Sequence, residues 1–550
     1  MIKLDNFINL FEAATRECWD RPALSDFRKS TISYRDLAVR IETLDLMWKR
    51  LGLRRGDKIA INTRPSAFGA SLFFAAVSKG YIAVQLYSAF TPLDTQRLVD
   101  HSDSKILYTE KRLFDAMCFE KMPQLLCVID GSSGEVLASR GGAEEIVRSA
   151  DKIFAEAHPN GMQPGDFHVI QAGMDDVCAI LYTSGSTGNP KGVMLTYRNF
   201  TANVQGIGRG FPFRKGENSL SLLPHAHSFG LTCDLVIPLS TGMHVTVLGV
   251  PPIPATVQEA LMEVRPRMFF GVPLIFVKLV DYILGADLRS PEDQAKFNDY
   301  ENHPGFCKRL NEKFMRETGG KIEAFVTGGA AIPTEVETLL VYKLKIPFVS
   351  GYGLTELAPI VSYGRVGKYI PKSCGEYLPD IMELRIDSPD PSRIAGELYI
   401  KGDVVFSGYY KNPKATAKVL KDGWFQTGDI GTVDRGNNVF LLGRSKNMIL
   451  SQSGQNVYPE EIEVILNELP YVAESIVLQR GNRIVALIVP DMNTLDKSGM
   501  TSDTLDAVMR QNIVALNAQL PAYSAVNDFE LHFEAFAKTP KGSIRRFLYK

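Results

Sequence analysis

The segment from Thr183 to Gly192 has the composition of a loop that binds a polyphosphate. It contains three glycines and four hydroxyl side chains, and it directly follows the apolar run 179–182. Glycines let backbone N–H groups approach phosphate oxygens closely, and Lys191 adds a compact positive charge. The Gly-x-x-x-x-Gly-Lys-Ser/Thr pattern of P-loop NTPases is absent. The candidate nucleotide-binding residues in this loop are Thr183, Ser184, Gly185, Ser186, Thr187, Gly188 and Lys191.

Two further segments could complete such a site. Residues 352–356 combine an aromatic ring, a hydroxyl and a carboxylate, and they follow the apolar residues 346–349. They are therefore predicted at the carboxyl end of a strand, which is where ligands bind in open α/β sheets. Residues 326–333 are rich in glycine and alanine, which allow the backbone to approach a ligand closely. Alone, each segment is also consistent with an ordinary surface turn.

The elements that must position these segments follow from the hydrophobic pattern. We predict strands at 58–62, 81–86, 105–109 and 125–130 and helices at 67–79 and 92–102. This alternation predicts parallel sheets covered by helices, an α/β fold. It resumes after a polar stretch and continues to about residue 365, and apolar residues at helical spacing also predict helices within 1–50.

The pattern changes twice toward the C-terminus. Short strands with turn signals predict a small β-rich subdomain over about 380–443. A new α+β unit then begins, with predicted helices at 459–468 and 502–519 and strands at 472–479 and 483–489. We therefore predict an N-terminal domain over 1–443 and a C-terminal domain over 444–550.

Bulk properties restrict the class of protein. A chain of 550 residues exceeds what one core usually supports. Lys and Arg (61) balance Asp and Glu (62), which gives no reason to expect a nucleic-acid partner. The seven cysteines form no Cys-x-x-Cys pair, which indicates reduced thiols in a cytoplasmic protein. No run of about 18 apolar residues predicts a transmembrane segment, and contact with a membrane surface, such as the inner face of the membrane, is left open.

Four segments, 183–192, 352–356, 423–429 and 443–444, occur in an order and at distances typical of one superfamily. From about residue 30 to 546 the chain resembles the adenylate-forming enzymes, which include acyl-CoA synthetases, beetle luciferases and the adenylation domains of peptide synthetases. The resemblance implies a large α/β N-terminal domain and a small mobile α+β C-terminal domain that acts as a lid. It also implies that ATP and Mg²⁺ activate a carboxylic acid and that coenzyme A accepts the acyl group.

The resemblance implies a role for each matching residue around the nucleotide. Tyr352 would stack on adenine, Thr355 would bond the α-phosphate, and Glu356 would hold Mg²⁺ together with Ser186. The backbone around the base would be formed by Gly329, Ala330 and Gly353.

The resemblance also implies roles for residues at the ribose, at the hinge and at the coenzyme A tunnel. Asp429 would accept both ribose hydroxyls, and Arg444 would reach ribose and phosphate. Lys446 matches the hinge of domain closure. Gly454 matches a loop that lines the coenzyme A tunnel. His227 matches a residue that screens the substrate carboxylate or gates that tunnel, and the alternative is a histidine satisfied within the core.

One position departs from the family pattern. Related sequences usually read Lys-Thr-x-x-Gly-Lys-Ile near the C-terminus, and their last lysine contacts the carboxylate and the α-phosphate. Ser543 stands at that position here. Lys541 shares a face with it in extended chain and is the candidate replacement. Slow adenylation and a degenerate nucleotide- or acyl-adenylate-binding protein are the alternatives.

The acyl substrate is predicted from two features. The phenylalanine-rich segment 265–279 resembles the long-chain fatty acyl-CoA synthetases and suits an apolar tunnel. Gly230 replaces the aspartate that binds the ammonium group in amino-acid adenylation domains, so an amino acid is disfavoured. We predict a medium- or long-chain fatty acid as substrate. Other carboxylates, such as aryl acids, a carrier-protein acceptor, and light emission are the alternatives.

Overall fold

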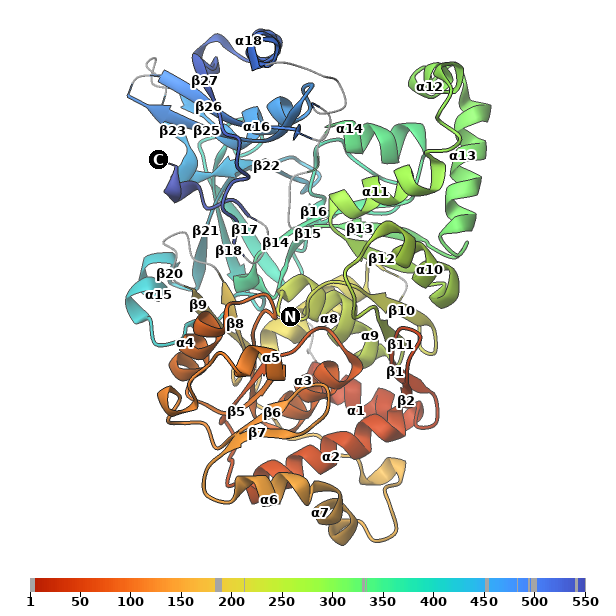
Figure 1. Cartoon of the computed structure of the whole chain (residues 1–550), viewed down its shortest axis with the longest axis vertical. Helices are drawn as coiled ribbons and strands as arrows, with labels where there is room; N and C mark the ends of the chain where they lie inside the picture. The colour runs from red at the N-terminus through yellow and green to blue at the C-terminus, as the bar shows by residue number, and fades with distance from the viewer. Residues whose placement is uncertain are drawn as a thin grey trace.

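The computed structural model describes residues 5–183, 190–211, 213–328, 332, 334–450, 455–481, 483–492, 495, 502–539 and 543–549. Figure 1 shows three groups of elements. Residues up to about 250 form the lower half, helices α10 to α13 lie on the right, and the C-terminal elements lie at the upper left. The strands β14 to β22 lie between these groups, so all three groups meet near the centre of the molecule.

The largest sheet has eight strands in the order β19-β9-β8-β4-β3-β5-β6-β7. Its strands are β3 (Lys58–Asn62), β4 (Ile82–Gln85), β5 (Ser104–Thr109), β6 (Cys127–Asp130), β7 (Val136–Ser139), β8 (Val177–Thr183), β9 (Lys191–Thr196) and β19 (Gly408–Tyr409). The predicted helices are confirmed as α3 (Ala67–Lys79) and α4 (Pro92–Ser102). The side chain of Thr91 caps α4 and Pro92 occupies its first turn, a favourable helix start.

The expectation of parallel pairing is correct only for the centre of this sheet. Strands β8, β4, β3, β5 and β6 are parallel, whereas β7 and β9 are antiparallel to their neighbours. The reason is the length of the connections, because a short loop can join only antiparallel strands. The predicted phosphate loop is such a connection: Thr183 on β8 lies opposite Lys191 on β9.

Two smaller sheets carry the other walls of the N-terminal domain. One has the order β10-β11-β1-β2 and the other β12-β13-β14-β15-β16. Their strands are β1 (Pro22–Asp26), β2 (Thr31–Ser33), β10 (Asn218–Ser221), β11 (His244–Val247), β12 (Met268–Gly271), β13 (Ala324–Thr327), β14 (Phe348–Gly353), β15 (Ile360–Tyr363) and β16 (Glu376–Tyr377). Strand β14 runs through Tyr352 and Gly353, so both lie on the strand and not after it.

Helices cover these sheets. The N-terminal helices predicted within 1–50 are α1 (Phe7–Glu17) and α2 (Tyr34–Arg50). The others on this side are α5 (Lys111–Phe114), α6 (Ala143–Arg148), α7 (Ala150–Ala157), α8 (Tyr197–Gly208) and α9 (Ile237–Thr241). The helices beside β12 to β14 are α10 (Pro254–Val264), α11 (Pro273–Leu284), α12 (Pro291–Asn298), α13 (Pro304–Glu317) and α14 (Thr334–Glu337). Over the part of the chain that is described, no helix combines the length and the apolar character needed to cross a bilayer.

The β-rich subdomain predicted over 380–443 is confirmed as an antiparallel sheet. Its order is β17-β18-β21-β20, with β22 paired to β21. The strands are β17 (Met382–Asp387), β18 (Gly396–Gly402), β20 (Leu420–Lys421), β21 (Trp424–Val433) and β22 (Val439–Arg444), and α15 (Pro413–Val419) precedes β20. On β21 and β22, Asp429 lies directly opposite Arg444, and residues opposite each other in a sheet are close enough for their side chains to interact.

The C-terminal residues have a core of their own. Its elements are β23 (Ile449–Leu450), β24 (Asn456–Val457), α16 (Pro459–Asn467), β25 (Val472–Arg480), β26 (Arg483–Pro490), α18 (Ser502–Asn517) and β27 (Asp528–Leu531). Strands β25, β26 and β27 form one sheet, and α16 and α18 contribute Leu466, Met509 and Leu516 to the core beside it. The predicted strands and helices of this region are confirmed, and Pro459 begins α16 as expected.

Candidate active site

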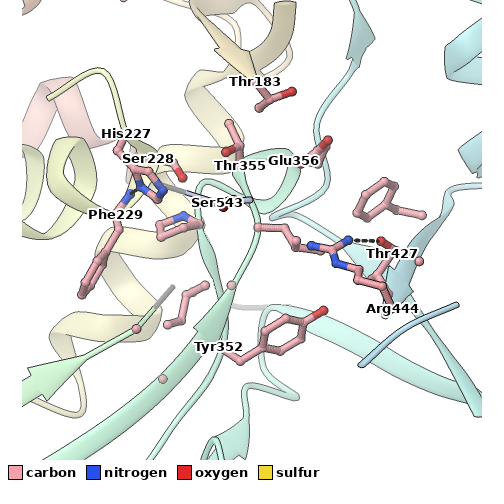
Figure 2. A pocket seen from close by; sticks show the side chains of 18 of the residues that line it. Thr183, His227, Ser228, Phe229, Tyr352, Thr355, Glu356, Thr427, Arg444 and Ser543 are labelled. Atoms are coloured by element: carbon pink, nitrogen blue, oxygen red, sulfur yellow. Dashed lines mark hydrogen bonds between the residues drawn. The ribbon is translucent and has the colours of Figure 1, made fainter. Parts of the chain in front are cut away.

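A cavity of about 890 Å³ lies where the three groups of elements meet (Figure 2). This volume is typical of sites that hold cofactor-sized ligands. Its walls come from the ends of β8, β13 and β14, from the segment 227–233, from residues 425–428 on strand β21, and from the C-terminal residues 539 and 543–547. Segments far apart in the sequence therefore face a single space.

Most of the predicted site residues that the structure describes line this cavity. They are Thr183, Lys191, His227, Tyr352, Gly353, Thr355, Glu356, Arg444 and Lys446. Asp429 lies directly behind two of them. Nine others fall outside the described residues: Ser184, Gly185, Ser186, Thr187, Gly188, Gly329, Ala330, Gly454 and Lys541.

Asp429 is the centre of a buried hydrogen-bonded group. The Tyr352 hydroxyl donates to its Oδ2 at 2.5 Å, and Nε of Arg444 lies 2.7 Å from its Oδ1. Arg444 also donates to the carbonyl oxygen of Thr427 at 3.3 Å, as Figure 2 shows. Burial raises the pKa of Asp429, an effect that the Arg444 charge opposes. The carboxylate is thus fixed in orientation at the cavity wall by groups from two sheets.

Glu356 is held by a residue from a distant part of the chain. The Tyr409 hydroxyl donates to Oε1 of Glu356 at 2.9 Å, and Nζ of Lys191 lies 4.8 Å from the centre of the Tyr409 ring. Tyr409 is on β19, which pairs with β9. The Tyr409 side chain therefore contacts the Glu356 carboxylate through its hydroxyl and the Lys191 ammonium group through its ring. Lys191 lies at the end of the predicted phosphate loop.

An apolar wall forms another side of the cavity. Phe211, Phe229, Phe270 and Tyr363 all line it. The ring centres of Phe211 and Tyr363 are 5.0 Å apart, and those of Phe229 and Phe270 are 5.9 Å apart, which are distances typical of favourable aromatic pairs. This wall is suited to the apolar part of a carboxylic acid.

His227 is placed at the cavity wall, which favours the site interpretation over a core histidine. Its Nδ1 accepts the backbone N–H of Phe229 at 3.1 Å, so a neutral ring carries its proton on Nε2. The histidine that is buried in the core is His225, which lies 2.9 Å from the Ser221 hydroxyl. Burial lowers the pKa of His225 to about 4.

Gly230 is required by the packing of its own backbone. A Cβ at this position would lie 2.6 Å from the carbonyl oxygen of Pro224 and 2.8 Å from Cβ of Leu223. Any side chain would therefore displace the segment that carries His227. The absence of an aspartate here follows from this packing, so it is weaker support for excluding an amino-acid substrate than the sequence implied.

Asp234 is a buried carboxyl beside this segment that sequence reasoning missed. Its Oδ2 accepts the backbone N–H groups of Leu222 and Leu223 at 3.2 and 3.0 Å, and no described group bonds to its Oδ1. Burial raises the pKa of Asp234 to about 8, so the folded protein holds this proton near neutral pH.

This protonation predicts how stability depends on pH. Because the pKa is about 8 in the folded chain and 3.8 as the ordinary value, the carboxyl should cost stability as the pH rises from about 4 through 8. Asp234→Asn, a neutral isostere, should flatten this loss, whereas Asp234→Leu should cost about 1–3 kcal/mol by leaving N–H groups unpaired. Urea unfolding at pH 6, 7.5 and 9 checks this. Identical pH profiles for wild type and Asp234→Asn would contradict it.

Ser543 enters the cavity from a short antiparallel pair of chain segments. Lys538 and Ile544 form a β-bridge, and the Thr539 N–H donates to the Ser543 carbonyl oxygen at 2.8 Å. Ser543 lines the same cavity as Ser228 and Thr355, and all three are labelled in Figure 2. Ser543, the position that departs from the family pattern, is therefore part of the cavity wall.

Several cavity residues give no signal in the sequence. Tyr409, Glu397 and Glu460 line the cavity, yet each stands in an ordinary strand or helix-start pattern. They reach the cavity only through long-range pairing. Thr427 also lines the cavity and lies within the segment 423–429, but it is not among the predicted site residues. A search for residues two positions before Asp429 could have suggested Thr427, since alternate strand residues share a face.

Comparison with known proteins agrees with this geometry. The model of a family described as AMP-binding enzymes matches residues 10–410. The chain is 27% identical to a fatty acyl-CoA synthetase A of Dictyostelium discoideum, over 85% of this chain and 73% of that protein. It is 28% identical to a feruloyl-CoA synthase of an Amycolatopsis species, over 94% of each.

The fold is found in solved structures as well. ATP-bound MatB from Rhodopseudomonas palustris superposes with a TM-score of 0.77, at 23% identity, over 99% of this chain and 98% of that one. At this identity the likeness establishes the fold alone. The family match, however, covers well over half of the chain and spans most of the cavity-forming segments. The chain therefore belongs to the family of AMP-binding, adenylate-forming enzymes.

Proposed function

We propose that this enzyme activates a carboxylic acid with ATP and then transfers the acyl group to coenzyme A. One observation carries the proposal. The ends of the phosphate loop at Thr183 and Lys191, the strand end at 352–356 and Arg444, which is paired with Asp429, all face one cavity that also has an apolar wall. A nucleotide and an apolar acid can therefore be held side by side.

The roles of the nucleotide-facing residues follow from their positions. Tyr352 would pack against the base, and Asp429 with Arg444 would bind the ribose hydroxyls and phosphate. Both oxygens of Asp429 are already engaged, so its carboxylate is oriented before the ligand arrives, which reduces the cost of binding. Thr183, Thr355 and Lys191 would face the phosphates together with loop residues 184–188.

Glu356 is the group that would hold Mg²⁺. The ion is usually bound by one or two carboxylates and by substrate phosphates. Glu356 lines the cavity and receives one hydrogen bond, from Tyr409. The described residues contain no cluster of three His, Cys, Asp or Glu side chains suited to a metal, which fits an ion carried in with the nucleotide. Ser186 would complete the set of Mg²⁺ ligands in the proposed site.

The first step would join the acid to the nucleotide. A carboxylate oxygen forms a bond to the α-phosphorus, and pyrophosphate leaves with the electron pair of the broken bond. The residues act mainly by positioning the reactants and by compensating charge. In the second step the C-terminal domain would turn about Lys446, His227 and Gly454 would border the path of the thiol, and the thiolate would displace AMP. One cavity would thus serve two reactions by gating.

A medium- or long-chain fatty acid is the proposed substrate. The aromatic wall supports an apolar acid, and several relatives are named as fatty acyl-CoA synthetases. The second candidate is an aryl acid, since other relatives are named as feruloyl-CoA synthases. An aromatic wall could also stack on such a ring.

The test is acyl-CoA formation by the purified full-length chain with ATP, Mg²⁺ and coenzyme A. We expect kcat/KM to rise with chain length among saturated acids from C4 to C16 and to exceed the values for benzoate and ferulate. Higher values for benzoate or ferulate than for the fatty acids would indicate that the substrate is an aryl acid. Adenylation without acyl-CoA formation would point to a different acceptor, and a protein that binds ATP without turnover would refute the activity.

A further inference from the structure

The C-terminal segment 543–547 lines the cavity but lacks a lysine at Ser543. Its backbone is fixed by pairing with 537–539. Besides the bridge between Lys538 and Ile544, the Arg545 N–H donates to the Ala537 carbonyl oxygen at 2.8 Å. The pairing ends at Arg545, because Arg546–Leu548 form a short 3-10 turn. Each residue of the segment is therefore judged by the contacts that its side chain makes.

Two residues of the segment, although they border the cavity, are held by contacts with their own domain. Ile544 packs on the apolar cluster that contains Phe536. Arg546 forms an ion pair with Glu463 on α16 and donates to the carbonyl oxygen of Val477. Ser543 and Arg545 are exposed, and both line the cavity. Arg545 is thus an exposed cation of the cavity lining, two residues along the chain from Ser543.

Three other described cations at this cavity are held by contacts within the protein. Arg444 is paired with Asp429 and Arg546 with Glu463, while Lys191 lies over the ring of Tyr409. Arg545 forms no ion pair with any residue that the structure describes. Its guanidinium group therefore remains available to an anionic ligand without first breaking a contact of this kind.

We propose that Arg545 supplies the positive charge of the adenylation step that Ser543 cannot supply. Its planar guanidinium group would contact the substrate carboxylate and the α-phosphate, which are the two anions that must approach each other. Arginine can bond such groups in a bidentate manner. The step is the one given above: a carboxylate oxygen bonds to the α-phosphorus, and pyrophosphate leaves with the electron pair. The proposal rests on the proposed function.

This proposal competes with Lys541, which also lies two residues from Ser543 in sequence. Both could bring a cation toward the same point, but they differ in chemistry. An ammonium group acts as a compact point charge, whereas the guanidinium group binds in a fixed planar geometry. Substitution of each residue separately distinguishes them.

The experiment compares both half-reactions in four variants of the full-length chain. Arg545→Ala should lower acid-dependent exchange of pyrophosphate into ATP by about 10²- to 10³-fold. It should leave thioester formation from supplied acyl-adenylate within about threefold, since the C-terminal domain has then turned away. Lys541→Ala should lower exchange by less than about tenfold. Arg545→Lys should restore part of the rate. The matched control is Arg483→Ala on β26, an exposed arginine outside the cavity, which should leave both rates unchanged.

Exchange within threefold of wild type for Arg545→Ala would overturn the proposal. So would a loss in Lys541→Ala that is larger than the loss in Arg545→Ala. Equal losses in both half-reactions would also overturn it, because they would indicate a structural defect. These results differ from a failure of the proposed function, in which wild-type protein itself gives no exchange with any acid.

Discussion

Glu356→Gln is expected to slow acyl-adenylate formation by about 10²- to 10³-fold, the usual effect of removing one electrostatic contact at a reacting phosphate. The amide keeps the shape of the side chain and can still accept the Tyr409 hydroxyl, which lies 2.9 Å away. It removes the negative charge that would bind Mg²⁺. Pyrophosphate exchange measured over a range of Mg²⁺ concentrations tests this, and the variant should require more Mg²⁺ for half its maximal rate.

Tyr409→Phe is the matched control for this change. It removes the hydrogen bond to Glu356 but keeps the carboxylate and the ring beneath Lys191. We expect a smaller loss than in Glu356→Gln, because the charged carboxylate remains and only one hydrogen bond to a charged group, about 1.5–3 kcal/mol, is removed. If Glu356→Gln keeps a rate within threefold of wild type at every Mg²⁺ concentration, Glu356 does not hold the metal.

Arg546→Ala is expected to destabilise the C-terminal domain by about 3–5 kcal/mol at pH 8, because it leaves the Glu463 carboxylate buried without its partner. Burial already raises the pKa of Glu463 to about 7 despite the opposing charge of Arg546. Without Arg546 the pKa should rise further. Hydrogen exchange in peptides from α16 and β25 measures this local stability.

The same pair predicts the sign of the pH dependence. The folded pKa of Glu463 lies above its ordinary value of 4.5, so its contribution to stability is greatest below pH 4.5 and is lost as the pH rises through 7. The penalty in Arg546→Ala should therefore be smaller at pH 5, where the carboxyl is protonated. Arg510→Ala breaks an exposed pair with Asp506 and should cost less than about 1 kcal/mol. Equal penalties in the two variants would contradict this account.

Local elements could be predicted from the sequence because their signals are local. The run 58–62 is a strand as predicted, and the helix 92–102 begins at a threonine cap followed by proline. The direction of β9 could not be predicted in this way. It depends on the loop 184–190 being too short for a crossover, and the apolar pattern of 191–196 is the same in either direction.

The candidate site likewise contains residues with a local sequence signal and residues that depend on long-range pairing. Tyr352, Glu356, Asp429 and Arg444 belong to dense local motifs, so the sequence indicates them, and their convergence follows from the positions of strand ends. Tyr409 reaches Glu356 only because β19 pairs with β9. No local pattern carries that information.

Buried charges were also hidden in the sequence. Asp234 and Glu463 look like ordinary surface carboxyls, because their burial and partners arise from tertiary packing. Arg545 gives no distinguishing signal in the sequence for a related reason. The sequence presents several cations near Ser543, and only the structure shows that Arg546 is paired with Glu463 while Arg545 is exposed at the cavity.

The most direct measurement of the central claim is the exchange of labelled pyrophosphate into ATP by the purified chain, with Mg²⁺ and without coenzyme A. Exchange requires that nucleotide and acid meet in one site and react reversibly. We predict exchange that depends on an added fatty acid and is lost in Glu356→Gln. Nucleotide binding without exchange, for every acid from C4 to C16 and for aryl acids, would contradict the account.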